Sequence, residues 1–494
     1  MRKAGILLHI SSLPSNYGIG TFGKEAYNFV DFLESTDQSY WQILPLGPTS
    51  YGDSPYQTFS AFAMNPYFID LDFLVKDKLL KKSEILDSQT SEAGVDYERL
   101  YHERFKVLRL AFDRFDLNNN YFQDFLRNEG YWLNDYTLFM AIKESQNSVS
   151  WAEWPEALRK REEHAINQAR HDFKDAINFH SFLQYEAYKQ WYNLKHYANE
   201  KGIQIIGDMP IYVSYDSSDV WTKPQYFQLD ENKLPTLIAG VPGDNFSPTG
   251  QLWGNPLYRW DILEGEDFAW WIDRVKSNTS MFDVLRIDHF IGFVHYFGIP
   301  YGDTTAERGE WFEGPGFKLF EAIKRHLGDR QIIAEDLGMI TDKVRALLKH
   351  TGYPGMKLLQ FAFDSREESD YIPHLYHNNV VAYTGTHDNE TTTQWFKNLK
   401  PSDLKYALEY INHVKGSKTD SLIKATLATV ADTAIIPMQD YLNLGSEARF
   451  NIPSTLGGNW VWRLKTGQID RMTRLKIKRF TKLYGRINPI SKAK

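Results

Sequence analysis

The chain contains no cysteine, and this absence excludes several kinds of chemistry at once. Without thiols there is no disulfide, no thiolate nucleophile, no cysteine-ligated zinc and no iron–sulfur cluster. Basic residues are also in the minority, since 56 Lys and Arg against 63 Asp and Glu give a net charge of −7. That balance argues against nucleic acid or an anionic membrane surface as the main partner.

Long hydrophobic runs are missing as well. The longest apolar stretches, such as 434–437, fall far short of the roughly 18 residues that a membrane span requires. The N-terminus begins with basic residues, but its apolar part (6–8) is too short for the hydrophobic region of a signal peptide. We therefore expect a cytoplasmic protein that does not contact a membrane.

Aromatic residues, in contrast, are abundant: 14 Trp, 29 Tyr and 31 Phe make up 15% of the chain. A large core in a chain of 494 residues is one explanation. Carbohydrate binding is another, because sugar rings present flat C–H faces that stack on aromatic rings. Composition alone leaves both interpretations open.

Eight short apolar segments, each ending in a polar or turn cluster, recur along the chain. Their lack of polar alternation indicates strands buried on both faces, as in a parallel sheet covered by helices. Helical patterns lie between them, so we predict a (β/α)₈ TIM barrel, with an open doubly wound sheet as the alternative. The predicted strands are Gly5–Ile10, Trp41–Leu46, Ile203–Asp208, Val284–Asp288, Ile332–Glu335, Lys357–Phe361, Val380–Thr384 and Thr433–Met438.

Two intervals between predicted strands are too long for a single helix. Residues 68–200, between strands two and three, carry amphipathic patterns and predict a helical insertion. Residues 212–280, between strands three and four, are rich in Gly, Pro and aromatics and predict a loop-rich insertion. Too few residues follow strand eight for a C-terminal β-sandwich, so we expect residues 1–494 to form one elaborated barrel.

Gly18, Gly20 and Gly23 match the G-x-G-x-x-G spacing of dinucleotide-binding folds. Such a fold also needs an acidic residue at the end of its second strand to bind the ribose. The second predicted strand ends at Leu46 and continues with Gly-Pro, without a carboxylate. We therefore interpret the glycines as a shaped turn and expect no cofactor. The sequence also lacks the phosphate-loop, zinc-protease and EF-hand patterns, so we expect no metal site.

Acidic residues stand at or just beyond the ends of four predicted strands: Asp208, Asp288, Glu335 and Asp388. The carboxyl ends of barrel strands share one rim, and active sites of this fold are built there. A single acidic residue in such a place is more often a helix N-cap. A network of structural ion pairs is the other structural explanation. Four strands ending in this way favour a catalytic group.

Arg286 and Asp288 lie two apart on one strand, so their side chains share a face. We expect Arg286 to hold Asp288 ionised, which suits attack on the anomeric carbon of a sugar. A second carboxyl on the next strand, Glu335, is expected in a less polar setting where it stays protonated and donates to the leaving oxygen. Retaining glycosidases place such a pair about 5–5.5 Å apart.

Longer segments around these residues resemble one family. The matching motifs are Gly47–Tyr56, Gly207–Val213, Gly250–Tyr258, Arg286–Phe290, Ala334–Gly338 and Gly385–Asn389, and the likeness runs from Leu7–Pro14 to Gly458–Arg463. The sequence is similar to the 4-α-glucanotransferases of the amylomaltase or disproportionating-enzyme type, glycoside hydrolase family 77 of the α-amylase clan.

The resemblance implies a role for each matching residue. Asp288 corresponds to the nucleophile, Glu335 to the general acid/base and Asp388 to the transition-state stabiliser. The substrate-binding positions implied in the same way are Tyr56, Asp208, Asp244, Gln251, Trp253, Arg286, Asp336, His387 and Asn459. Residues 243–251 resemble a lid loop that closes over bound glucan.

The implied activity moves α-1,4-glucan segments to the 4-hydroxyl of an acceptor glucan or of glucose, without a cofactor. The implied substrates are maltooligosaccharides, amylose and glycogen. The first alternative is an intracellular α-1,4-glucan hydrolase of the same clan, which sends the same intermediate to water. The second is a non-catalytic glycan-binding protein, although that protein would be expected to lack one of the three carboxylates. A glucan phosphorylase would need pyridoxal phosphate and a different fold.

Overall fold

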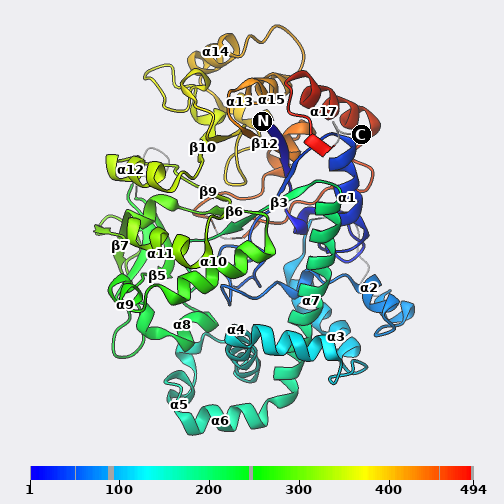
Figure 1. Cartoon of the computed structure of the whole chain (residues 1–494), viewed down its shortest axis with the longest axis vertical. Helices are drawn as coiled ribbons and strands as arrows, with labels where there is room; N and C mark the ends of the chain where they lie inside the picture. The colour runs from blue at the N-terminus through cyan, green and yellow to red at the C-terminus, as the bar shows by residue number, and fades with distance from the viewer. Residues whose placement is uncertain (1, 51, 87–93, 244–248, 456, 491–494) are drawn as a thin grey trace.

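Eight parallel strands form the centre of the fold, and helices surround them (Figure 1). The computed structural model describes residues 2–50, 52–86, 94–243, 249–455 and 457–490. The strands lie in the order β10-β11-β12-β1-β2-β3-β6-β9, and the amide of Ala334, the last residue of β9, donates to the Pro354 carbonyl before β10 at 3.0 Å, which closes the ring. These strands are β1 (Lys3–Leu7), β2 (Tyr40–Gln42), β3 (Gln204–Met209), β6 (Val284–Ile287), β9 (Ile332–Ala334), β10 (Gly355–Leu358), β11 (Val380–Tyr383) and β12 (Thr433–Pro437).

The predicted barrel is confirmed, and each of the eight predicted strands overlaps an observed one. Successive residues face opposite sides of the barrel wall. Leu7 and Ile206 belong to the cluster inside the barrel, whereas Ile6 and Ile205 pack in the larger cluster between strands and helices. All four side chains are fully buried. Because both faces of each strand are covered, the sequence shows continuous apolar runs instead of alternation.

Most of the barrel helices run back to the start of the next strand. α11 is typical: Leu319, Phe320, Ala322 and Ile323 form its buried face, at the spacing of an amphipathic helix. Between β10 and β11 the chain makes only short 3₁₀ turns. The barrel helices and their C-terminal neighbours are α1 (Lys24–Ser35), α10 (Ala269–Met281), α11 (Phe317–Leu327), α12 (Asp342–Thr351), α13 (Thr392–Asn398), α14 (Pro401–Tyr410), α15 (Lys418–Ala428), α16 (Met438–Tyr441) and α17 (Arg471–Leu483).

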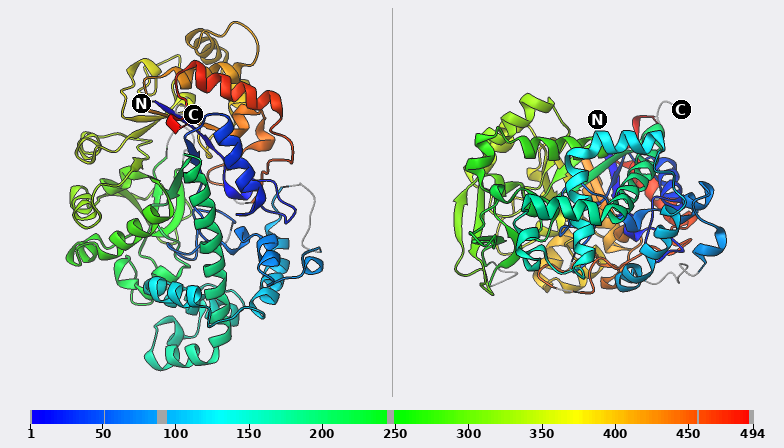
Figure 2. Two further views of the ribbon diagram at one scale, coloured as in Figure 1. Left: turned by 45° about the vertical axis from the view of Figure 1, so that its right-hand side comes forward. Right: turned by 90° about the horizontal axis from the view of Figure 1, so that it is seen from below.

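A group of helices lies between β2 and β3 and extends the molecule at one end (Figures 1 and 2). They are α2 (Leu71–Lys76), α3 (Tyr97–Phe112), α4 (Asn120–Ser145), α5 (Glu156–Arg159), α6 (Glu163–Asp172) and α7 (Lys174–Glu200). The long helix α7 packs against α4 and leads directly into β3, so it belongs to both parts. Its Gln184 side chain bonds both the amide and the carbonyl of Met64, which ties the helices to the loop after β2.

A second sheet of four antiparallel strands, in the order β5-β4-β7-β8, stands beside the barrel. Its strands are β4 (Leu237–Val241), β5 (Gln251–Pro256), β7 (His295–Pro300) and β8 (Glu310–Glu313), with the short helices α8 (Ser218–Thr222) and α9 (Trp260–Gly265) nearby. The region predicted as loop-rich therefore supplies two paired strands. One of the two, β4, also pairs with β7, which lies beyond β6 in the chain. Such long-range pairing leaves little local signal in the sequence.

In the described residues after β12 the chain forms α16 and α17 but no strand, so this part contains no β-sandwich. No helix among the described residues combines the length and the apolar character needed to cross a membrane. The glycine-rich turn is explained by close packing. A Cβ on Gly20 would lie 1.8 Å from the Ile10 carbonyl oxygen, and one on Gly23 would lie 1.8 Å from a carboxylate oxygen of Asp70.

Candidate active site

Strand register brings the predicted acidic residues to one rim of the barrel. Asp208 on β3 lies directly opposite Arg286 on β6. On the other side of β6, Ile287 pairs with Ala334 and the Glu335 amide donates to the Ile287 carbonyl at 3.0 Å, so Glu335 continues β9 level with Asp288. Parallel strands end at the same edge, and the three carboxylates consequently face the barrel mouth together.

The buried guanidinium of Arg286 contacts all three of these carboxylates and is only 1% exposed. Its Nη1 donates to both oxygens of Asp208 at 2.6 Å. Its Nη2 lies 3.2 Å from Oδ1 of Asp288 and 2.9 Å from Oε1 of Glu335. Those two oxygens are therefore at most about 6 Å apart, which fits the separation of a retaining pair and is shorter than the roughly 6.5–9.5 Å of inverting enzymes.

Asp288 and Glu335 are too close and too buried to carry two negative charges, so they titrate as a pair. Burial and the neighbouring Glu335 charge raise the pKa of Asp288 well above its usual range, and Arg286 does not offset them. Burial alone would also raise the pKa of Glu335, but Arg286, Asp288 and the His289 amide, 2.6 Å from Oε2, bring it below its usual range. The two carboxyls therefore share one proton as a coupled pair.

Which carboxyl of the pair carries the proton stays a prediction, and the expected arrangement is an ionised Asp288 beside Arg286 and a protonated Glu335. Two contacts influence this balance. Arg286 divides its contacts among three carboxylates, and its Nη1 donates to both oxygens of Asp208. The His289 backbone amide serves Glu335 alone, and a backbone contact of this kind is not visible in residue types or spacing.

A chain of side chains links this group to Asp388, beyond the end of β11. The Tyr56 hydroxyl donates to Oδ2 of Asp208 at 2.7 Å. The Tyr56 ring stacks on His387, with centroids 5.2 Å apart and planes at 17°. Nε2 of His387 lies 3.3 Å from Oδ2 of Asp388. The structure therefore joins seven of the predicted residues in one network at the barrel mouth: Tyr56, Asp208, Arg286, Asp288, Glu335, His387 and Asp388.

Comparison with known proteins agrees with this arrangement. A family model described as 4-alpha-glucanotransferase matches residues 8–469. The chain belongs to the 4-alpha-glucanotransferase family.

Individual relatives cover almost the whole chain. A 4-alpha-glucanotransferase of Clostridium butyricum is 49% identical over 485 residues, which span 97% of this chain and 100% of the relative. A chloroplastic/amyloplastic 4-alpha-glucanotransferase of Solanum tuberosum is 41% identical, covering 94% of this chain and 82% of the relative. The solved structure of an amylomaltase from Streptococcus agalactiae in complex with acarbose matches with a TM-score of 0.96 at 46% identity, covering 98% of this chain and 100% of that one.

Two of the substrate-binding positions expected from the family lie on β5, beside the catalytic pair. The Trp253 indole donates to Oε1 of Gln251 at 3.1 Å. The Trp253 ring also meets His289 edge-on, with centroids 4.9 Å apart and planes at 87°. His289 follows Asp288 directly in the chain, so the Trp253 ring packs against the neighbour of the proposed nucleophile. Contact of this aromatic surface with a bound glucan stays a prediction.

Two other expected substrate-binding positions, Asp336 and Asn459, are not joined to the network by a direct contact that the structure describes. The Asp336 carboxylate accepts from the Met356 amide at 2.7 Å and so stabilises the start of β10. The Asn459 side chain accepts from the Ile452 amide at 3.0 Å and donates to Thr455, which closes a loop. Asp244, with most of the expected lid loop 243–251, lies outside the described residues. Substrate contact by these residues stays a prediction.

Sequence reasoning did not single out Asn451, whose amide donates to Oδ1 of Asp388 at 2.7 Å. Burial alone would raise the pKa of Asp388, but His387 and Asn451 bring it well below its usual range, so Asp388 is ionised. Nη2 of Arg449 donates to the Asp388 carbonyl at 2.9 Å and fixes its backbone. Both residues lie in an irregular segment far along the chain, and neither belongs to a recognisable motif.

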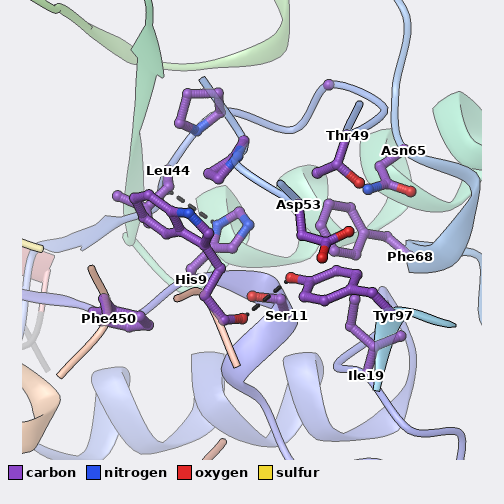
Figure 3. Close-up of a pocket in the computed structure, with 14 residues that line it drawn as sticks. His9, Ser11, Ile19, Leu44, Thr49, Asp53, Asn65, Phe68, Tyr97 and Phe450 are labelled. Carbon is purple, nitrogen blue, oxygen red and sulfur yellow. Dashed lines mark hydrogen bonds between the residues drawn. The ribbon is translucent and has the colours of Figure 1, made fainter. Parts of the chain in front are cut away.

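Trp460 is a further member of the site. The sequence feature that could have identified it is its position next to Asn459 in a matching motif. Its ring lies 5.9 Å from both Tyr56 and His387. Behind it is a cavity of about 10 Å³, room for one water molecule, lined by His9, Tyr97 and others (Figure 3). Burial lowers the pKa of His9 to about 3, so this ring is neutral. The cavity is too small for a sugar and supports the site from behind.

Proposed function

We propose that this chain transfers α-1,4-glucan segments from a donor to the 4-hydroxyl of an acceptor glucan by a retaining double displacement. The observation that carries the proposal is the contact of Asp288 and Glu335 with one nitrogen of Arg286. This contact sets the short separation that a nucleophile and an acid/base need on the two sides of one glycosidic bond. The similar amylomaltase was solved with acarbose, which supports a carbohydrate ligand here.

In the first step Asp288 attacks the anomeric carbon while Glu335 protonates the departing 4-oxygen, which leaves a β-linked glucosyl-enzyme. This step needs the single proton of the pair on Glu335, with Asp288 ionised. Moving one proton within the pair changes no net charge. The bound glucan supplies the bias, because its glycosidic oxygen accepts from Glu335 and its anomeric carbon attracts the Asp288 anion.

In the second step Glu335 acts as a base and deprotonates the 4-hydroxyl of the acceptor, which displaces Asp288. Two inversions give net retention, and the new bond is equivalent to the old one, so no energy source is required. Asp388 is ionised and stabilises the positive charge that develops on the sugar ring in both transition states. Tyr56 and His387, stacked on each other, form the apolar floor beneath that ring.

Transfer occurs when a sugar hydroxyl attacks the glucosyl-enzyme, and hydrolysis occurs when water does. An aromatic surface at Trp253 favours a sugar over water in the position from which attack occurs. Glucose, which has the same 4-hydroxyl, is proposed as the smallest acceptor. A hydrolase of the same clan would use the same carboxylates and differ in this partition alone. The expected cytoplasmic location also stays a prediction.

Incubation with maltotriose tests the proposal. A transferase redistributes chain lengths and releases some glucose while total reducing ends stay constant. A hydrolase raises reducing ends steadily. Chromatography of the products, together with a reducing-end assay over time, separates the two outcomes, and a steady rise without longer products would contradict the proposed transfer.

A further inference from the structure

Glu335 is held by the backbone of the segment that follows β6. Its amide donates to the Ile287 carbonyl at 3.0 Å, and its carbonyl accepts from the Phe290 amide at 2.9 Å. Between these two contacts, the His289 amide donates to the side-chain oxygen Oε2 at 2.6 Å. Three of the four residues from 287 to 290 therefore fix the main chain and the carboxyl of a single glutamate.

The third contact depends on an unusual backbone conformation. His289 has φ 48° and ψ 48°, which is the left-handed region. Asp288 before it still donates to Met209 on β3 at 3.0 Å, and Phe290 after it donates toward the β9 side. The left-handed residue between them turns its own N–H away from both neighbours and into the site. For a residue with a Cβ this conformation costs roughly 1–2 kcal/mol, and such strain is concentrated at functional sites.

The His289 side chain has a different surrounding. Its ring meets Trp253 edge-on and covers Gly292, where an added Cβ would come 2.8 Å from Cδ2 of the ring. Burial lowers the pKa of His289 to about 4, so the ring is neutral at neutral pH. Within the described part of the chain the ring makes no hydrogen bond that would relay a proton. The imidazole is a packing element.

We propose that His289 is a positioning residue that acts through its backbone: its left-handed turn aims the amide at Oε2 of Glu335 and so fixes the orientation of the carboxyl that gives its proton to the leaving oxygen. The inference rests on the proposed retaining transfer. The charged groups that face the carboxyl are Arg286 on β6, Asp288 directly after it, Asp336 after β9 and Asp388 beyond β11. Among the residues that the structure describes, the His289 amide is the donor to Oε2, and Nη2 of Arg286 lies 2.9 Å from Oε1.

Three substitutions at this position separate the backbone from the ring. Asn tolerates the left-handed region, so His289→Asn keeps the amide in place and retains transfer to within about threefold of the wild type. His289→Ala is intermediate. In His289→Val the branched side chain disfavours the turn, the amide moves, and kcat/KM falls roughly tenfold to a hundredfold.

The pH dependence of kcat/KM separates a positioning role from a merely structural one, because a structural role would not shift it. The His289 amide stabilises the ionised form of Glu335, so weakening this bond raises the pKa at which the pair takes up its second proton. The acid limb of kcat/KM consequently moves to higher pH in His289→Val and stays in place in His289→Asn. A variant that is only less stable loses activity at all pH values alike.

Asn412 provides a matched control, because it has φ 50° in an exposed turn after α14, away from the site. Asn412→Val imposes similar backbone strain and leaves both the rate and the acid limb unchanged. Equal losses in His289→Asn and His289→Ala would overturn the inference in favour of the ring, and this comparison remains decisive if His289→Val does not fold. Absence of transfer by the wild type on maltotriose would instead contradict the proposed function.

Discussion

Replacing Asn451 by alanine removes the hydrogen bond that holds Oδ1 of Asp388 at 2.7 Å. A hydrogen bond to a charged group contributes about 1.5–3 kcal/mol, and about 1.4 kcal/mol corresponds to tenfold in rate. The Asp388 side chain is 41% exposed, so water replaces part of the lost contact. We therefore expect kcat/KM on maltotriose to fall about tenfold, at the lower end of that range.

The pH dependence sharpens this prediction. Asn451 is only one of the groups that hold the pKa of Asp388 well below its usual range, so Asp388 stays ionised in Asn451→Ala and the loss is the same at about pH 7 and at about pH 5. Asn451→Asp is the matched variant whose loss does depend on pH. It places a second carboxylate beside Asp388 at neutral pH, and its activity relative to wild type recovers toward acid pH as the new carboxyl takes up a proton and donates it.

Initial rates of glucose release from maltotriose at the two pH values measure both trends, with thermal unfolding as the control for folding. A loss below about twofold in Asn451→Ala at both pH values, with an unchanged unfolding midpoint, would refute the reasoning. The same conclusion would follow if Asn451→Asp and Asn451→Ala responded to pH in the same way.

Three further outcomes are expected. Asp288→Asn and Glu335→Gln each abolish transfer on maltotriose while circular dichroism and thermal unfolding stay close to wild type; near-normal turnover in either would contradict the assigned roles. Arg286→Met leaves the fully buried carboxylate of Asp208 unpaired, so urea unfolding shows a loss of about 3–5 kcal/mol, and adding Asp208→Asn recovers part of it. Gly23→Ala brings a methyl group within 1.8 Å of a buried carboxylate oxygen, so the melting temperature drops by several degrees; an unchanged value would show that the turn has more room than the structure indicates.

The barrel was predictable because its strands are buried on both faces and end in a shared rim. Asp208, Asp288 and Glu335 could be placed together for the same reason, since strand ends that converge need no knowledge of side-chain packing. The second sheet was not predictable, because β4 pairs with β7 across the whole of β6. No periodicity within either segment indicates that partner.

Two features of the site also lay beyond the sequence. The contact of Asn451 with Asp388 joins an irregular segment to the end of β11, and nothing in the local pattern marks it. The balance of charge between Asp288 and Glu335 depends on how a single guanidinium is shared and on where the His289 amide points. Both are properties of three-dimensional packing, whereas residue type and spacing describe only which groups are present.

The shared guanidinium has a consequence for which sugars are admitted. Asp208, Asp388 and the singly protonated pair of Asp288 and Glu335 together bear more negative charge than Arg286 neutralises. A phosphorylated ring would meet this excess at short range in a poorly hydrated space, and the repulsion there is strong. Neutral glucose units encounter no such barrier, so the mouth of the barrel sorts its occupants by charge before any hydroxyl is recognised.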